Sequence, residues 1–289
     1  MPGILTPYLD DGYTWLRGNL HAHTTLSDGR LSPGEVLAAY EREGYDFLAI
    51  SDHDRLVPPD DYRDATRLLL LPAVEVTARG PHMLAIGVQS IVEPDADRQR
   101  CIEQAAGMGA ITILNHPNWG VGYNHFPQER MEALRGYAGI EIYNAVIEWL
   151  EGSALALDRW DRLLSSGRRV WGFANDDMHW PENVGRGWSV AQCREHTPAA
   201  VLEALREGRF YASTGVTIDS VRLASGVLAV EAPDAQRIRF VGRWGRELAF
   251  VDGPRAAYPI GGGEGGYVRA ECYGAGGRTA WTQPVWVPE

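Results

Sequence analysis

The chain contains no lysine, and all 27 of its basic residues are arginines. A P-loop, a Schiff base and a pyridoxal-phosphate anchor each need a lysine side chain, so this absence excludes those nucleotide-binding and covalent mechanisms. The glycine-rich run at 261–266 is therefore predicted to be a flexible loop and not a phosphate cradle.

Basic charge as a whole is scarce. The 38 acidic residues outnumber the 27 basic ones, which gives a net charge of −11, and the arginines form no cluster. Such a surface repels a long polyanion, so we expect no extended nucleic acid as a partner, whereas a short nucleotide fragment is not excluded.

Cysteines and long apolar runs are few. Cys101, Cys193 and Cys272 are far apart, odd in number and without metal-like spacing, which favours free thiols over disulfides. No apolar stretch approaches 18 residues, and residues 1–7 lack the features of a secretory signal. We therefore expect a cytoplasmic protein with no membrane partner, and the sequence leaves its oligomeric state open.

Strands and helices alternate along most of the chain. Apolar runs predict strands at 47–51, 69–76, 83–88, 111–115, 140–143 and 170–174, and helical patterns fall at 33–43, 94–108, 128–135, 153–166 and 199–207. This alternation predicts an α/β fold with a parallel barrel. Beyond residue 215 only short alternating runs remain, so we predict a barrel domain at 1–215 and a small antiparallel β domain at 216–289.

Two histidines one residue apart are the strongest functional signal. At a period of two, His21 and His23 leave a strand on the same face, which brings two imidazoles together. Asp28 follows after a turn and can return a carboxylate to the same place. A lone His-x-His pair also arises by chance, so its meaning depends on the residues further along.

Further ligand-type side chains come at or just past the ends of apolar runs. They are Asp52, His53, Glu75, His82, Asn115, His116, Asp177 and His179. Barrel enzymes keep their chemistry at strand ends, so this repetition predicts one shared metal site.

Through His21-x-His23 with Asp28, Ser51-Asp52-His53, Glu75, His116-Pro117 and Asp177-x-His179, residues 15–180 resemble the polymerase-and-histidinol-phosphatase (PHP) superfamily of metal-dependent hydrolases. Residues 208–215 and the β-rich tail are similar to the branch that includes carbaryl-type carbamate hydrolases. Members usually carry an acidic residue two positions before the first histidine, where this chain has Asn19. The resemblance implies a distorted (β/α)7 barrel of the PHP type.

The resemblance also implies a trinuclear ligand set. One ion is held by His21, His23, Glu75 and Asp177, a second by Glu75, His82 and His116, and a third by Asp28, His53 and His179. The donor types suit two to three divalent transition-metal ions, Mn, Zn or Fe.

Three dications against three carboxylates leave a surplus of about three positive charges, which favours an anionic substrate. We therefore expect a phosphoesterase that attacks a small phosphorylated substrate or a short oligonucleotide end with a metal-bridging hydroxide, with Glu75 and Asp177 as catalytic ligands. Hydrolysis of a carboxylic ester, carbamate or amide by the same site is the alternative. A non-catalytic metal-binding protein is the second alternative.

Arginines on loops after strands are candidates for gripping phosphate, because a guanidinium binds phosphate oxygens with two parallel hydrogen bonds. Arg186, flanked by glycines, is the leading candidate and is assigned a catalytic role; Arg17 and Arg79 are weaker ones.

Other polar residues have supporting or neutral roles in this prediction. The loop at 119–126 is interpreted as a lid or recognition wall, with His125 on its surface, and His196 is expected to be inert. Asp52 and Asn115 either orient ligand imidazoles or serve as turn or cap residues.

Overall fold

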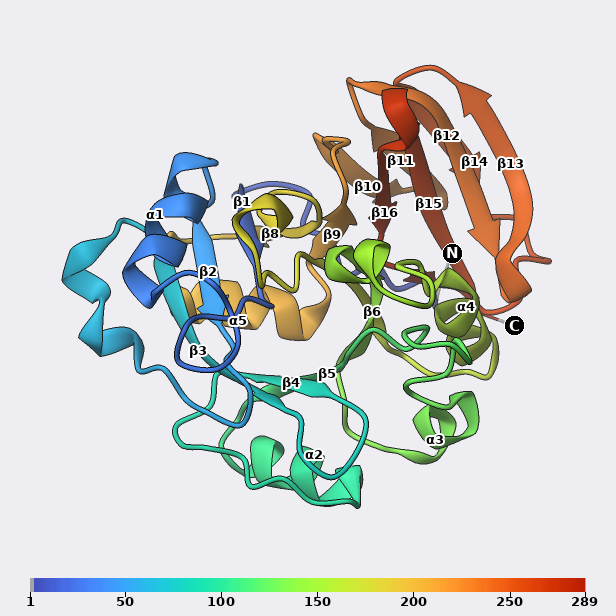
Figure 1. Cartoon of the computed structure of the whole chain (residues 1–289). Coiled ribbons are helices and arrows are strands. Elements are labelled where there is room, and N and C mark those ends of the chain that lie inside the picture. Colours follow the sequence, from blue (N-terminus) through green and yellow to red (C-terminus); the bar gives the residue numbers. More distant parts are fainter. Residues whose placement is uncertain (1–2, 289) are drawn as a thin grey trace.

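A computed structural model describes residues 3–288 of the chain. It has an α/β part built on strands β1 to β9 and a C-terminal antiparallel β part (Figure 1). The first nine strands are β1 (Thr14–Asn19), β2 (Phe47–Ile50), β3 (Leu69–Val76), β4 (Met83–Ile86), β5 (Ile111–Leu114), β6 (Gly139–Asn144), β7 (Trp171–Asn175), β8 (Trp188–Cys193) and β9 (Phe210–Ser213). The helices are α1 (Pro33–Arg42), α2 (Arg98–Gly107), α3 (Gln128–Ala133), α4 (Leu157–Ser165) and α5 (Pro198–Glu207).

The strands from β1 to β7 lie side by side in sequence order within one large sheet. The pairs β1–β2, β2–β3, β5–β6 and β6–β7 are parallel, so these strands end on one edge. In the described residues no ladder joins β7 to β1. A single parallel bridge between Ala22 and Met178 links the segments that follow those two strands.

Strand β4 departs from the predicted parallel order, because it runs antiparallel to both β3 and β5. Only residues 77–82 separate β3 from β4. A parallel crossover needs about a dozen residues or more, so this short connection forces a reversal of direction. The same connection carries His82 back beside the end of β3.

The predicted helix boundaries have identifiable causes. Ser32 and Glu35 form the expected capping box at the start of α1, with the Ser32 amide donating to Glu35 Oε2 at 2.8 Å. Thr197 caps α5 by accepting from the Ala200 amide. Gly208 ends α5 at φ +75°, and a Cβ there would lie 2.6 Å from the Trp171 ring, so only glycine fits this turn.

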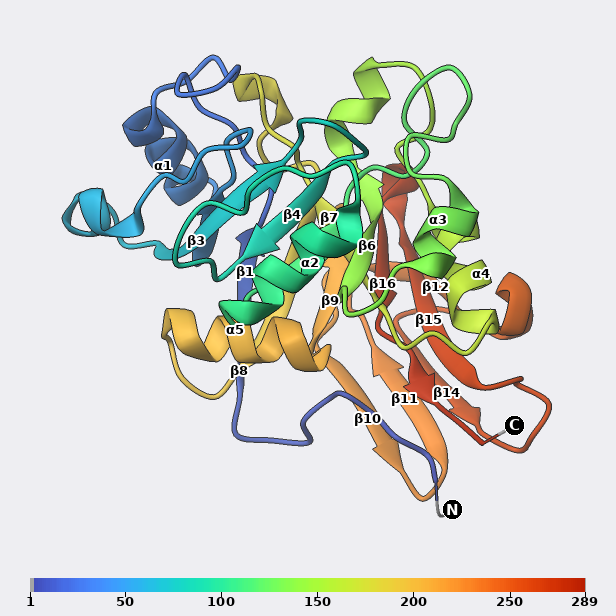
Figure 2. The same cartoon turned by 90° about the horizontal axis from the view of Figure 1, so that it is seen from below.

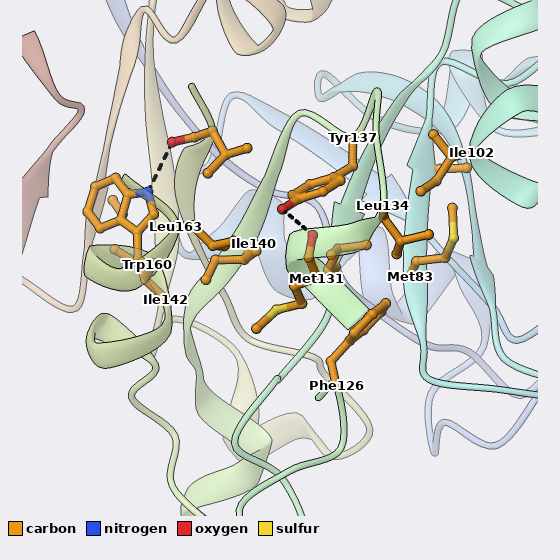
Figure 3. Close-up of a cluster of buried hydrophobic side chains, with 14 of the residues drawn as sticks. Met83, Ile102, Phe126, Met131, Leu134, Tyr137, Ile140, Ile142, Trp160 and Leu163 are labelled. Carbon is orange, nitrogen blue, oxygen red and sulfur yellow. Dashed lines mark hydrogen bonds between the residues drawn. The ribbon is translucent and has the colours of Figure 1, made fainter. Parts of the chain in front are cut away.

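Helices pack apolar faces against the sheet. Figure 2 shows α2 and α5 lying over the strands of the α/β part. In the core shown in Figure 3, residues from α3, α4 and β6 interlock, and the buried polar atoms in it are paired: Tyr137 donates to the Met131 carbonyl and Trp160 to the Val170 carbonyl. This packing holds the strand ends in register.

The C-terminal part contains β10 (Ser220–Ala224), β11 (Val227–Glu231), β12 (Ala235–Gly242), β13 (Arg246–Asp252), β14 (Arg255–Pro259), β15 (Tyr267–Gly274), β16 (Thr279–Thr282) and β17 (Val285–Trp286). Strand β16 pairs with β9, so one sheet runs across the predicted boundary at 215/216. The Gln283 side chain exchanges two hydrogen bonds with the Gly172 backbone, and Leu5 pairs with Trp286. The boundary therefore stays a prediction, and the two parts are held together by backbone contacts.

The three cysteines are free and buried, as predicted. In the glycine-rich loop, the buried Glu264 carboxylate accepts from the amides of Gly261 and Gly262, so the loop's own side chain occupies these donors. None of the helices in residues 3–288 is long and apolar enough to cross a bilayer.

Candidate metal centre

The backbone aligns the two motifs that contain alternating ligand candidates. Ala22 and Met178 form the parallel bridge, and the His23 amide donates to the Met178 carbonyl at 2.8 Å. Both bridging side chains are fully buried in the apolar core. The ligand candidates on either side of the bridging residues, His21, His23, Asp177 and His179, come together in the site.

Glu75, at the end of β3, lies at the centre of this site. Its carboxylate oxygens are 2.7–3.5 Å from ring nitrogens of five histidines: His21 Nε2, His23 Nε2, His53 Nδ1, His82 Nδ1 and His116 Nε2. Asp177 faces the same centre, with Oδ1 3.1 Å from both His21 Nε2 and His23 Nε2. Asp28 lies at the mouth and is 55% exposed, with its oxygens 3.4 Å from His53 and His179.

Three groups, two of which share His23, have the geometry to hold a metal ion, since one ligand atom of each member lies within 4.8 Å of the others. They are His21, His23 and Glu75; His23, Asp28, His53 and His179; and His82, His116 and His125. These groups contain eight of the nine residues that the sequence nominated as ligands together with His125, and the ninth, Asp177, contacts His21 and His23.

Buried ligand atoms without partners test whether ions fit here. His21 Nε2, His23 Nδ1 and Glu75 Oε2 are buried and form no hydrogen bond with any described residue. An unpaired buried polar atom costs about 1–3 kcal/mol, so three of them in one cluster fit a site that cations complete. The donors are imidazole nitrogens and carboxylate oxygens, which suit divalent transition metals.

The electrostatics of the cluster also favour cations. Burial alone would lower the pKa of His21, but the carboxylates of Asp177, Glu75 and Glu141 outweigh it and raise that pKa well above its usual value. Burial would raise the pKa of Glu75, yet His21 and His82 hold it well below its ordinary range. The carboxylates of the cluster thus favour positive charge at His21, and a metal ion bound to an imidazole nitrogen competes with a proton for the same atom.

Glu141, in the middle of β6, is a residue that the sequence prediction missed. Its carboxylate accepts from His21 Nδ1 at 2.8 Å, from the His116 amide at 2.8 Å, and from the side-chain amides of Asn144 and Asn175. A carboxylate behind a ligand imidazole fixes the ring and its tautomer. The available signal was a charged residue inside the otherwise apolar run at 140–143.

Asn115 and Asp52 have supporting roles other than contact with ligand imidazoles. Asn115 Nδ2 donates to Glu75 Oε1 at 2.7 Å, so it orients the central carboxylate. Asp52 accepts from the amide and hydroxyl of Thr24 and from the Ser27 hydroxyl, which is the turn role left open by the sequence. Asn19 Oδ1 accepts from the His21 amide and positions that backbone.

The prediction of a surface position for His125 was wrong. Its ring lies 4.6 Å from His82, 4.7 Å from His116 and 4.7 Å from Trp119, measured between ring centroids, and is partly buried. His125 Nε2 accepts from the His82 backbone amide at 2.9 Å. The loop folds back because Trp119 pairs with Gly152, a contact that the sequence does not reveal.

Arg186 does not line the cavity at the cluster. Asp176 accepts from the backbone amides of residues 185–187, and the Arg186 guanidinium contacts the Glu182 carbonyl and Glu148 instead. It lines a separate cavity toward the C-terminal part. Arg17 is sandwiched between the rings of Tyr45 and Trp188, and Arg79 is exposed and likewise absent from the lining.

Two residues at strand ends have a left-handed backbone. His116 has φ +26° and Asp177 has φ +51°, a region that non-glycine residues seldom adopt. Such strain persists only where surrounding contacts hold it, and it concentrates at functional sites. Here the His116 amide is held by Glu141, and Asn144 donates to Asp177 Oδ2.

The cluster opens into a cavity of about 230 Å³. Its lining contains the ligand candidates Asp28, His53, Glu75, His82, His116, Asp177 and His179, and the apolar or aromatic residues Trp119, Val146, Ile147, Leu150 and Trp180. Val146 and Ile147 belong to the short 3-10 helix η3 (Ala145–Trp149) that follows β6. Sites for drug-sized ligands are about 300–1,000 Å³, so this cavity suits a small molecule.

Residues 166–210 match the family model described as PHP-associated. A 5′-3′ exoribonuclease of Haemophilus influenzae is 33% identical over 75 residues, which are 24% of this chain and 27% of that protein, so the chain matches only about a quarter of its length. A two-domain protein of Bacteroides vulgatus, described as containing a predicted PHP-like metal-dependent phosphoesterase, superposes with a TM-score of 0.59 at 19% identity and covers 94% of both chains. The lesion-specific endonuclease of Pyrococcus furiosus superposes with a TM-score of 0.45 at 14% identity, covering 67% of this chain and 56% of its own.

The PHP-associated match and the shared fold confirm the resemblance to the PHP superfamily. They say nothing about the carbamate-hydrolase branch. The shared fold includes the C-terminal antiparallel part, because the match to the Bacteroides protein extends over nearly the whole chain.

Proposed function

We propose that the protein is a metal-dependent phosphoesterase that hydrolyses a small phosphorylated substrate or a short oligonucleotide end. The observation that carries this proposal is the position of Glu75, whose buried carboxylate lies within 3.5 Å of five imidazoles. A carboxylate with two oxygens facing different groups of histidines is placed to bridge two ions.

The proposed ions number two to three and are Mn, Zn or Fe, with His21, His23, Glu75 and Asp177 around the first. His82 and His116 with Glu75 would hold the second, and Asp28, His53 and His179 the third. Divalent ions held there would supply the acidity that activates water near neutral pH and the positive charge that stabilises phosphoryl oxygens.

The chain's own residues keep this arrangement rigid. Glu141 fixes the ring of His21, Asn115 fixes the carboxylate of Glu75, and Asn144 holds Asp177. We propose that β1–β7 form a distorted (β/α)7 barrel closed at the Ala22–Met178 bridge, with 216–289 as an accessory domain. The cavity volume supports a small anionic substrate.

Hydrolysis of a neutral carboxylic ester, carbamate or amide is the second candidate. The observation in its favour is that one wall of the cavity is apolar and that no arginine is among the described residues lining it. The surplus positive charge of a loaded site favours the phosphoester instead.

The experiment compares Glu75→Gln with Glu129→Gln, an exposed control on α3. Each protein is loaded with Mn²⁺, and turnover of a phosphomonoester and of the matching carboxyl ester is measured. The proposal predicts phosphate release by the wild type and the control and its loss, with loss of bound metal, in Glu75→Gln. Turnover of the carboxyl ester alone would establish the second candidate, and full metal binding with no turnover of either ester would indicate a metal-binding protein.

A further inference from the structure

The cavity at the metal centre has two chemically different sides. Beside the ligand candidates, its lining includes two indoles, Trp119 and Trp180, and the aliphatic side chains of Val146, Ile147 and Leu150. Among the described lining residues the only charged groups are the histidines and carboxylates of the cluster itself. When the phosphate of a substrate lies at the cluster, the remainder of that substrate must therefore contact apolar side chains.

Both indoles lie next to ligand candidates of the metal centre. Trp119 follows His116 by three residues, and its ring centroid is 5.1 Å from that of His116 and 5.5 Å from that of His82. Trp180 follows His179 directly, with a ring separation of 5.7 Å. The two flat side chains thus flank the reacting centre from the ends of two different strands.

Hydrogen bonds to the backbone hold the segments that carry the two indoles. The backbone of Trp119 pairs with Gly152, and the Gly120 amide donates to the Glu151 carbonyl at 2.8 Å. Asn183 Oδ1 accepts from the amides of both His179 and Trp180. Because the backbone at both indoles is already held, binding of a flat ring does not have to order these segments.

We propose that the group attached to the scissile phosphoester is a flat, uncharged aromatic ring, bound between Trp119, Trp180 and Leu150. This proposal rests on the proposed function and specifies its substrate class. An indole-lined wall favours a ring because aromatic pairs gain contact energy beyond their buried area. A ring that carries a carboxylate or a second phosphate finds no cation on this wall, and the protein discriminates against it.

The test uses benzyl phosphate and n-propyl phosphate, both esters of primary alcohols, so that the acidity of the leaving group differs little between them. The metal-loaded wild type is expected to prefer benzyl phosphate in kcat/KM by roughly 10-fold or more. Trp180→Leu, which keeps an apolar side chain, should reduce this preference roughly 5-fold to 10-fold. The matched control is Trp244→Leu, because Trp244 in the C-terminal part is 65% exposed and does not line the cavity.

Leu150→Arg is the converse variant, at a position that is 41% exposed and tolerates a long side chain. It should raise kcat/KM for 4-carboxybenzyl phosphate relative to benzyl phosphate, because it places a cation beside the ring. A second pair, uridine 5′-phosphate and ribose 5-phosphate, distinguishes the source of the ring. A preference for the uridine compound that Trp180→Leu removes assigns a nucleobase, and a preference confined to the benzyl pair assigns an aryl alcohol.

Failure of this inference is distinct from failure of the proposed function. Hydrolysis of both members of each pair at equal rates overturns the aromatic subsite and leaves the phosphoesterase intact. No hydrolysis of any phosphoester by the loaded protein overturns the phosphoesterase. In that case calorimetric titration with benzylphosphonate and propylphosphonate still tests the subsite, and equal affinities overturn it.

Discussion

The Nδ1–H group of His21 donates to Glu141 Oε1 at 2.8 Å, with both side chains fully buried. This contact leaves Nε2 of the same ring facing Glu75 and Asp177. Glu141 on strand β6 thereby supports His21, a ligand candidate that follows β1. The site therefore depends on the order of the strands in the sheet as much as on the ligands themselves.

Glu141→Gln should lower the affinity for metal roughly 10-fold to 100-fold. Glutamine keeps one acceptor oxygen, but its NH₂ group would face donors, since all four partners of Glu141 donate to it. Titration calorimetry of Mn²⁺ measures the change, with Glu129→Gln as the exposed control. An affinity equal to that of the wild type would show that Glu141 does not orient His21.

His125→Phe should weaken one ion more than the others. The substitution removes the acceptor for the His82 amide, so the backbone beside a proposed ligand loses a buried hydrogen bond, and affinity at that site should fall about 10-fold. His125→Gln, which can present an oxygen at a similar reach, should restore most of the affinity. Equal binding by wild type and His125→Phe, measured as metal ions per chain in a titration, would remove His125 from the centre.

Arg186→Met should change kcat/KM for a phosphoester by no more than about two-fold, which corresponds to about 0.5 kcal/mol. The guanidinium contacts Glu182 and Glu148 and does not line the cavity, so substrate has no reason to meet it. A loss of 10-fold or more with unchanged metal content would place Arg186 back in the phosphate site.

Arg269→Met should destabilise the protein by about 3–5 kcal/mol. This buried guanidinium on β15 binds Asp161 of α4 and Glu271, so the variant removes a cation from two buried carboxylates, of which Glu271 keeps Arg239 at 3.4 Å. The exposed pair Arg237–Asp252 offers a control, because Arg237→Met should cost less than about 1 kcal/mol. Chemical denaturation measures both; equal small losses would mean that the ion pair does not join the two parts.

The ion pair between Arg269 and Glu271 predicts that the stability of the fold depends on pH. Burial raises the pKa of Glu271, but Arg269 and the Tyr273 hydroxyl outweigh it and hold that pKa below the ordinary value of 4.5. A depressed folded-state pKa stabilises the fold above pH 4.5, and this contribution is lost as the pH falls through the folded-state value. Denaturation between pH 3 and 7 should show a smaller acid loss in Glu271→Gln than in the wild type. Parallel curves would exclude this contribution.

Several parts of the fold and site follow from local pattern. The capping box at Ser32, the eight-residue strand β3 and the spacing of His21 and His23 are short-range features, and the predicted elements agree with the observed ones to within a few residues. Positions at strand ends indicated a shared site, because parallel strands deliver their ends to one edge, and the family resemblance implied which nine residues are the ligands.

Other parts depend on contacts between distant segments. Glu141 supports His21 only because β6 lies beside β7, whose following segment pairs with Ala22. His125 lies in the site because Trp119 pairs with Gly152. Arg186 lies outside the site because Asp176 holds the backbone of the loop that carries Arg186. The short connection at 77–82 indicates that β4 reverses direction. The alternation of strands and helices along the rest of the chain instead predicted a parallel strand there.

The most direct test of the account is a metal titration of chelator-treated protein in which bound Mn²⁺ and phosphate release from benzyl phosphate are measured in the same samples. The account predicts binding of two to three ions per chain, with phosphate release rising as they bind and absent in Glu75→Gln. Binding of less than one ion per chain, or full occupancy without phosphate release from any phosphoester, would contradict it.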